Sequence, residues 1–171
     1  MLKKNISALS CLLVLTGCAS VQDYVPPQNT DTANVVVTRN ITAPLLGYTS
    51  TLFKLETFKT CHEEIGKNKA TRFMVLDKGN PLIAEVNAEG VDVAVNEPVN
   101  LFMVTVAGPF NGSCSSIVKF TPESGKDYEI RLLGDITQSP GRCTAELWST
   151  QAGSNIAQQD SFEEYDDCNP Q

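Results

Sequence analysis

Cysteine and histidine are the residues of this chain with the widest choice of chemistry. The sequence holds six cysteines and one histidine, and Cys61 and His62 are neighbours followed by Glu63 and Glu64. A Cys–His pair could form a nucleophile, and a histidine beside carboxylates could bind a metal ion. Neighbouring side chains on a strand or loop point apart, however, and a disulfide-bonded cysteine cannot attack a substrate. We therefore expect a solvated loop here, without catalytic residues, metal or cofactor.

Known catalytic motifs are missing elsewhere in the sequence as well. The chain has no Gly-x-Ser-x-Gly elbow, no phosphate-binding loop and no paired-histidine metal motif. A serine hydrolase would have to recruit the single histidine, His62. The sequence thus predicts a protein that is not an enzyme.

The N-terminus combines a basic start, a short apolar stretch and a cysteine. Lys3 and Lys4 precede a largely apolar run over residues 6–15, too short for a spanning helix, which needs about 20 residues. The tetrapeptide Leu15-Thr16-Gly17-Cys18 resembles the lipobox of bacterial lipoproteins. The resemblance implies that residues 1–17 are a cleaved signal peptide and that Cys18 carries the lipid. The alternative is an ordinary signal peptide with an incidental cysteine.

The residues after Cys18 indicate in which membrane such a lipoprotein is anchored. Ala19 and Ser20 follow the cysteine, whereas an Asp in the first of these positions usually retains a lipoprotein in the inner membrane of enteric bacteria. The resemblance therefore implies an outer-membrane lipoprotein, and we expect it to face the periplasm.

Charge narrows the classes of partner. Loss of residues 1–17 would leave 154 residues, enough for one domain, with 11 of the 13 basic side chains against 20 acidic ones, a formal charge of −9. Nucleic-acid binding needs a basic face, so we expect no nucleic-acid partner. Charge would not attach the protein to an anionic membrane either, and the lipid on Cys18 would have to anchor it.

Four cysteines remain for disulfides in an exported domain: Cys61, Cys114, Cys143 and Cys168. Four cysteines allow three pairings. On the expected strands, Cys114 shares a face with Val118, and Cys143 shares a face with Leu147. Both thiols thus lie on apolar faces, and this favours Cys114–Cys143, with Cys61–Cys168 as the second bond. A four-cysteine zinc site is the rival interpretation, but no two of these cysteines have the spacing of a zinc knuckle.

Two further features could bind something. Trp148 lies on the strand face opposite Cys143 and Leu147, so it could anchor a partner or stack on a sugar, or simply cover a sheet edge. An acidic tail could offer oxygen ligands to calcium, although its spacing is not that of a calcium loop and a charge run is usually solvated. The tail carboxylates are Asp160, Glu163, Glu164, Asp166 and Asp167.

Period-2 alternation dominates the chain after a polar stretch with Pro26 and Pro27. We expect a lipidated tether over residues 18–33 and a β-sandwich domain over residues 34–171, with the acidic tail at its end. Strands are expected at residues 34–39, 51–55, 72–76, 82–86, 91–95, 99–106, 113–120, 127–132 and 142–148, with a possible edge strand at 154–158. The run 99–106 is almost wholly apolar, as in a central strand covered on both faces. Residues 61–69 are the only helical candidate.

These strands and their turn signals predict an all-β fold, an antiparallel sandwich of about seven to nine strands. Residues 113–130, continuing to Cys143, resemble the C-terminal half of small bacterial lipoproteins with an immunoglobulin-like sandwich and no assigned function. There, a strand ending in an aromatic residue, here Phe120, is followed by a Gly-Lys turn, a Tyr strand and a later Cys. The resemblance supports an immunoglobulin-like fold and implies nothing about activity.

Three functional classes stay open from the sequence. The preferred one is a lipid-anchored, non-enzymatic interaction module that binds an unidentified envelope protein. The alternative is a glycan or small-ligand binder, which would use exposed aromatic residues such as Trp148 or Tyr48. An enzyme built around His62 is the third.

Overall fold

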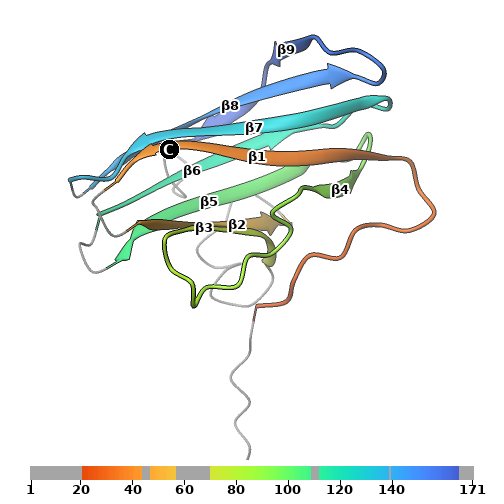
Figure 1. The fold of residues 1–171 in the computed structure, drawn as a ribbon. Helices are drawn as coiled ribbons and strands as arrows, with labels where there is room; N and C mark the ends of the chain where they lie inside the picture. The colour runs from red at the N-terminus through yellow and green to blue at the C-terminus, as the bar shows by residue number, and fades with distance from the viewer. Residues whose placement is uncertain (1–20, 44–46, 57–69, 109–111, 139, 166–171) are drawn as a thin grey trace, which may run out of the picture.

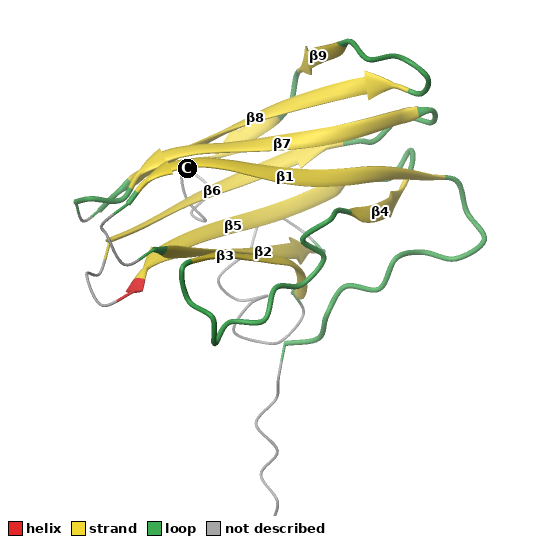
Figure 2. Ribbon diagram, in the orientation of Figure 1, coloured by secondary structure: helices red, strands yellow, loops and turns green. Residues whose placement is uncertain are grey.

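A computed structural model describes residues 21–43, 47–56, 70–108, 112–138 and 140–165. Strands and loops make up nearly all of these residues (Figure 2). The strands are β1 Thr32–Thr42, β2 Tyr48–Leu55, β3 Thr71–Lys78, β4 Val91–Ala94, β5 Val99–Ala107, β6 Gly112–Phe120, β7 Lys126–Asp135, β8 Arg142–Gln151, β9 Ala157–Asp160 and β10 Glu163–Tyr165. The expected helix at 61–69, Cys18, His62 and the proposed Cys61–Cys168 bond lie outside the described residues.

The strands form two five-stranded sheets that pack face to face (Figure 1). The first sheet has the order β4-β1-β7-β8-β9, and the second has the order β10-β6-β5-β2-β3. The all-β sandwich is confirmed, with ten strands among the described residues where seven to nine were expected. One pairing is not antiparallel: β1 runs parallel to β7, from Val35 opposite Tyr128 to Thr42 opposite Asp135.

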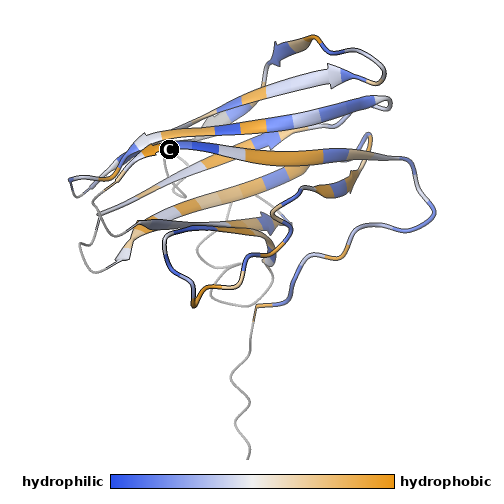
Figure 3. Cartoon of the chain, in the orientation of Figure 1, coloured by the Kyte–Doolittle hydropathy of each residue, from blue (hydrophilic) through white to orange (hydrophobic). Residues whose placement is uncertain are grey.

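Alternating side chains build the core between the sheets. Val35 in β1 and Ile130 in β7 are fully buried there, and Leu52 and Leu101 meet them from the second sheet. Figure 3 shows the alternation of apolar and polar residues along β7. One face of each strand is therefore in the core and the other faces solvent, as period-2 patterning requires.

Strand β5 corrects one expectation. It is central, between β2 and β6, but it is not covered on both faces. Phe102 and Val104 on its outer face are partly exposed, and Val106 is 44% exposed. The apolar run instead supplies two apolar surfaces, one in the core and one on the outside of the second sheet.

The strand expected at 82–86 is wrong. The segment is part of the β3–β4 loop, and only Val86 makes a bridge, to Val75. Asn80 holds the turn: Asp77 Oδ2 accepts its N–H, and its Oδ1 accepts the Leu82 N–H at 3.0 Å. Such side-chain bonds to the backbone compete with strand pairing.

The C-terminal strands also differ from expectation. The edge strand foreseen at 154–158 is β9, which begins only at Ala157. Strand β10 was not foreseen, since its residues were taken for a charged tail. It pairs with β6 in the second sheet, with Glu163 opposite Lys119.

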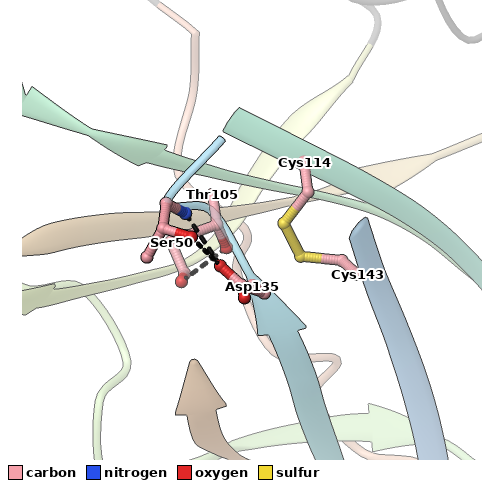
Figure 4. Close-up of a disulfide and its surroundings, with 6 residues drawn as sticks. Ser50, Thr105, Cys114, Asp135 and Cys143 are labelled. Carbon is pink, nitrogen blue, oxygen red and sulfur yellow. Dashed lines mark hydrogen bonds between the residues drawn. A yellow bond between two sulfur atoms is a disulfide. The ribbon is translucent and has the colours of Figure 1, made fainter. Parts of the chain in front are cut away.

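The predicted Cys114–Cys143 disulfide is confirmed. It joins β6 of the second sheet to β8 of the first, with the two Cα atoms 5.4 Å apart (Figure 4). Next to it, the Thr105 and Ser50 hydroxyls share a buried hydrogen bond of 2.8 Å. At the start of β6, the backbone of Gly112 lies against the backbone of Ile136. A Cβ at position 112 would overlap the Ile136 carbonyl oxygen. Only glycine fits there.

Replacing both Cys114 and Cys143 by Ala should destabilise the sandwich. The bond closes a loop of 29 residues, and constraint of the unfolded chain by such a loop is worth about 3–4 kcal/mol. Urea unfolding of the oxidised wild type and the double variant would measure the difference in the free energy of unfolding. Equal stabilities would contradict this role of the bond.

Candidate functional site

The first described residues are bound to the sandwich. Arg72 of β3 donates its N–H to Gln22 O at 2.7 Å, and its carbonyl accepts the Tyr24 N–H at 2.9 Å. The Asp23 carboxylate receives a hydrogen bond from Arg72 Nε at 2.6 Å, and this bond lowers the pKa of Asp23. Within the stretch expected to be a tether over residues 18–33, residues 22–24 are thus bound to β3.

Tyr24 fills the open edge between the two sheets. Its ring packs on Phe73 with centroids 5.2 Å apart, and Lys54 Nζ lies 4.8 Å from its centroid. Its hydroxyl donates to Asp92 O of β4 at 3.4 Å. Burial raises the pKa of Tyr24 and lowers the pKa of Lys54. The Tyr24 side chain therefore contacts both sheets, six residues after Cys18, the predicted lipid acceptor.

A hollow of about 820 Å³ lies on the outer face of the second sheet, beside this segment. It is lined by Phe53 of β2 and Val75 of β3, by Val21 of the N-terminal segment and by Ile83 of the β3–β4 loop. The wall is mainly apolar, with the Asp23–Arg72 ion pair at its border. A smaller hollow of about 380 Å³ shares Ile83.

The outer face of the second sheet also carries a small apolar cluster. Leu55, Ala70 and Ile117 are at most 2% exposed there. Phe53 and Phe102 are stacked beside them with ring centroids 6.4 Å apart. This face is consequently more apolar than the outer face of the first sheet.

Trp148 lies on the outer face of the first sheet, as expected, and is only partly exposed. Its indole N–H donates to Glu146 Oε2 at 3.0 Å, and the Arg131 guanidinium lies 4.2 Å from its ring centroid. Arg131 in turn donates to Glu129, whose other oxygen accepts the Thr38 hydroxyl. This surface, the Arg131–Trp148 face, is ordered by its own hydrogen bonds.

Glu129 sets the charge balance of the Arg131–Trp148 face. The hydrogen bond from Arg131 lowers the pKa of Glu129, with a smaller contribution from Thr38. The same bond raises the pKa of Arg131. Both groups stay charged at neutral pH, and the guanidinium remains stacked on Trp148.

Tyr48 is buried, although it lines part of the smaller hollow. It is 5% exposed and part of the core, with Arg39 5.2 Å from its ring centroid. The proposal that Tyr48 is an exposed aromatic contact is therefore wrong, because its position in β2 points it between the sheets.

The described part of the acidic tail is divided between the sheets. Asp160 in β9 lies 3.9 Å from Lys126, whereas Glu163 in β10 lies 3.4 Å from Lys119. Among the residues that the structure describes, no three potential metal-ligating side chains come together. Asp166, Asp167, Cys61, Cys168 and His62 lie outside the described residues, as does Cys18.

Comparisons with known proteins add nothing to this geometry. No protein-family model, curated protein or solved structure matches the chain. Within the described residues, no helix has the length and apolarity needed to cross a bilayer.

The contacts of Tyr24 predict that Tyr24→Ala releases the N-terminal segment. The variant loses the ring contact with Phe73, so the Tyr24 position should exchange its amide hydrogen faster than in the wild type. Hydrogen exchange followed by mass spectrometry measures this. Val25→Ala is the matched control, because Val25 is 73% exposed. Unchanged exchange at position 24 in the Tyr24 variant would contradict the expected anchoring.

The lowered pKa of Glu129 predicts an acid-dependent loss of stability. Its ion pair stabilises the fold fully above the ordinary glutamate value of 4.5, and this stabilisation is lost as pH falls through the lower folded pKa. Glu129→Gln should be less stable at neutral pH and lose less on acidification below about 4.5. Urea unfolding at neutral and acidic pH measures this. Glu89→Gln, at an exposed loop carboxylate, should retain the wild-type acid dependence.

Proposed function

We propose that this chain is a lipid-anchored protein of the bacterial cell envelope, acylated on Cys18, that acts as a non-enzymatic interaction module. The site of action proposed is the periplasmic side of the outer membrane. Support comes from the lipobox-like residues before Cys18 and from a disulfide-linked domain, which suits an oxidising compartment.

The observation that carries the proposal is the position of the first bound residue. Gln22 is already hydrogen-bonded to β3, only four residues after Cys18. Four residues of extended chain span at most about 14 Å. A lipid on Cys18 would thus hold the sandwich against the bilayer surface, rather than at the end of the long tether that the sequence alone favours.

The charge of the protein also favours attachment through the lipid rather than through the protein surface. A mature chain with a formal charge of −9 is repelled by anionic lipids. Several acyl chains on one cysteine hold firmly, at about 0.8 kcal/mol for each buried methylene. The lipid would therefore supply the attachment, and the protein surface would remain available for recognition.

The Arg131–Trp148 face is the surface we propose for an envelope protein partner. It lies on the outside of the first sheet, whereas residues 22–24 are bound to the second sheet (Figure 1). A domain held at the membrane by residue 18 would turn this face away from the bilayer. Arg and Trp side chains already held in one geometry lose little conformational freedom on binding.

A small-ligand binder is the second candidate, favoured by the hollow beside the N-terminal segment. Its volume of about 820 Å³ lies within the range of small-molecule sites, and its wall is mainly apolar with one ion pair, but it is open to solvent. Ligand binding there would be compatible with a lipid anchor, since the hollow lies next to Val21.

Labelling of cells with radioactive palmitate tests the anchor. Wild-type protein should incorporate the label, and Cys18→Ser should lose it, because the variant lacks the sulfur that forms the thioether. Cys11→Ser is the matched control, since Cys11 lies within the proposed signal and should not affect labelling. An unlabelled wild type, or label that persists in Cys18→Ser, would refute acylation at Cys18.

A further inference from the structure

The tip of the β3–β4 loop is an exposed apolar turn. Residues 81–84 read Pro-Leu-Ile-Ala and carry no charge. Leu82 is 92% exposed, more than any other large apolar residue that the structure describes. Figure 3 shows this apolar tip on the loop below the sandwich. Leu82 therefore contributes little to the core, and with Pro81, Ile83 and Ala84 it forms a short run of apolar residues at the loop tip.

The N–H groups of Leu82 and Ile83 at this tip are hydrogen-bonded within the turn. Pro81 has no N–H group, the Leu82 N–H is bonded to Asn80 Oδ1, and the Ile83 N–H is bonded to Asn80 O at 3.2 Å. Transfer of an unpaired N–H group out of water is costly. Because these two N–H groups are satisfied within the turn, neither of them loses a hydrogen bond when the tip leaves water.

The tip lies beside the point where the chain departs toward Cys18. Val21 and Ile83 line the same hollow, and the described chain begins on the same side of the molecule as the loop (Figure 1). The three residues from Cys18 to Val21 span at most about 11 Å. An acylated Cys18 would hold this side of the sandwich at the lipid surface.

We propose that the loop tip, with Leu82 at its apex, inserts into the interfacial region of the bilayer that holds the lipid of Cys18. This inference rests on the proposed acylation. The occupant is a lipid surface rather than a protein, because the short chain from Cys18 brings the tip to the bilayer. The uncharged tip suits electrically neutral headgroups, since the acidic domain gains nothing from an anionic surface. Insertion gives the domain a second point of attachment and fixes its orientation.

Quenching by brominated lipid tests this contact. Acylated mature protein, beginning at Cys18, is reconstituted into phosphatidylcholine vesicles with or without bromine on the acyl chains, and flotation confirms its attachment. The wild type has one tryptophan, Trp148, which should not be quenched. Leu82→Trp adds a second, and bromine should remove up to about half of its total emission, since one of its two indoles would lie among the acyl chains.

Ile156→Trp is the matched control. Ile156 is 72% exposed and precedes β9, at the edge of the first sheet opposite β4, and its variant should behave like the wild type. Equal quenching of all three floating proteins would overturn the docking and leave the anchor standing. A blue-shifted Leu82→Trp emission that bromine does not quench would mean that a protein covers the tip, which also overturns it. Failure to float would refute the anchor, and the docking with it.

Discussion

Closure of the sandwich edge between β3 and β4 is the constraint on which the rest of the structure depends. These two strands are the edges of different sheets on the same side of the molecule, and a gap there would expose the core. Tyr24 fills it by packing on Phe73 and reaching the Asp92 carbonyl. The chain then crosses from β3 to the first sheet, where β1 runs parallel to β7. The N-terminal segment is thus part of the fold, and its position determines which side of the domain an anchor at residue 18 would hold.

The sequence predicted the features that depend on local periodicity. Alternation in β4 and β7 placed Val93 and Ile130 in the core, where both are fully buried. The same phase placed Cys114 and Cys143 on facing apolar sides, and this was enough to choose their pairing. Trp148 was assigned to the outer face for the same reason. Such inferences succeed because a strand exposes alternate side chains to the same environment along its whole length.

Features that depend on contacts between distant segments could not be predicted in this way. Residues 22–24 have no apolar periodicity that would predict a strand. They are extended because their backbone is hydrogen-bonded to the free edge of β3. Strand β10 is similar, since its charged residues pair with β6. In the β3–β4 loop, the Asn80 side chain overrides the strand propensity of its neighbours. Tyr48 was expected to be exposed but is buried. A tyrosine near a turn can face the core or the solvent, and its packing against the core determines which. The hollow lined by Val21 and Ile83 could not be predicted from the sequence either, because these two residues are 62 positions apart in the chain.

The two outer faces of the sandwich carry different physical chemistry, and this makes its orientation consequential. On the first sheet, ion pairs and the Arg131–Trp148 stack satisfy the polar groups and leave a hydrated surface. On the second, Phe53, Phe102 and the loop tip leave apolar area partly open to water. A domain attached at residue 18 alone could rotate about its short connection and present either face. The proposed apolar contact next to the connection would remove that freedom, because it would gain free energy only when the second sheet faces the lipid. The polar face would then be directed into the periplasm, toward the proposed envelope partner.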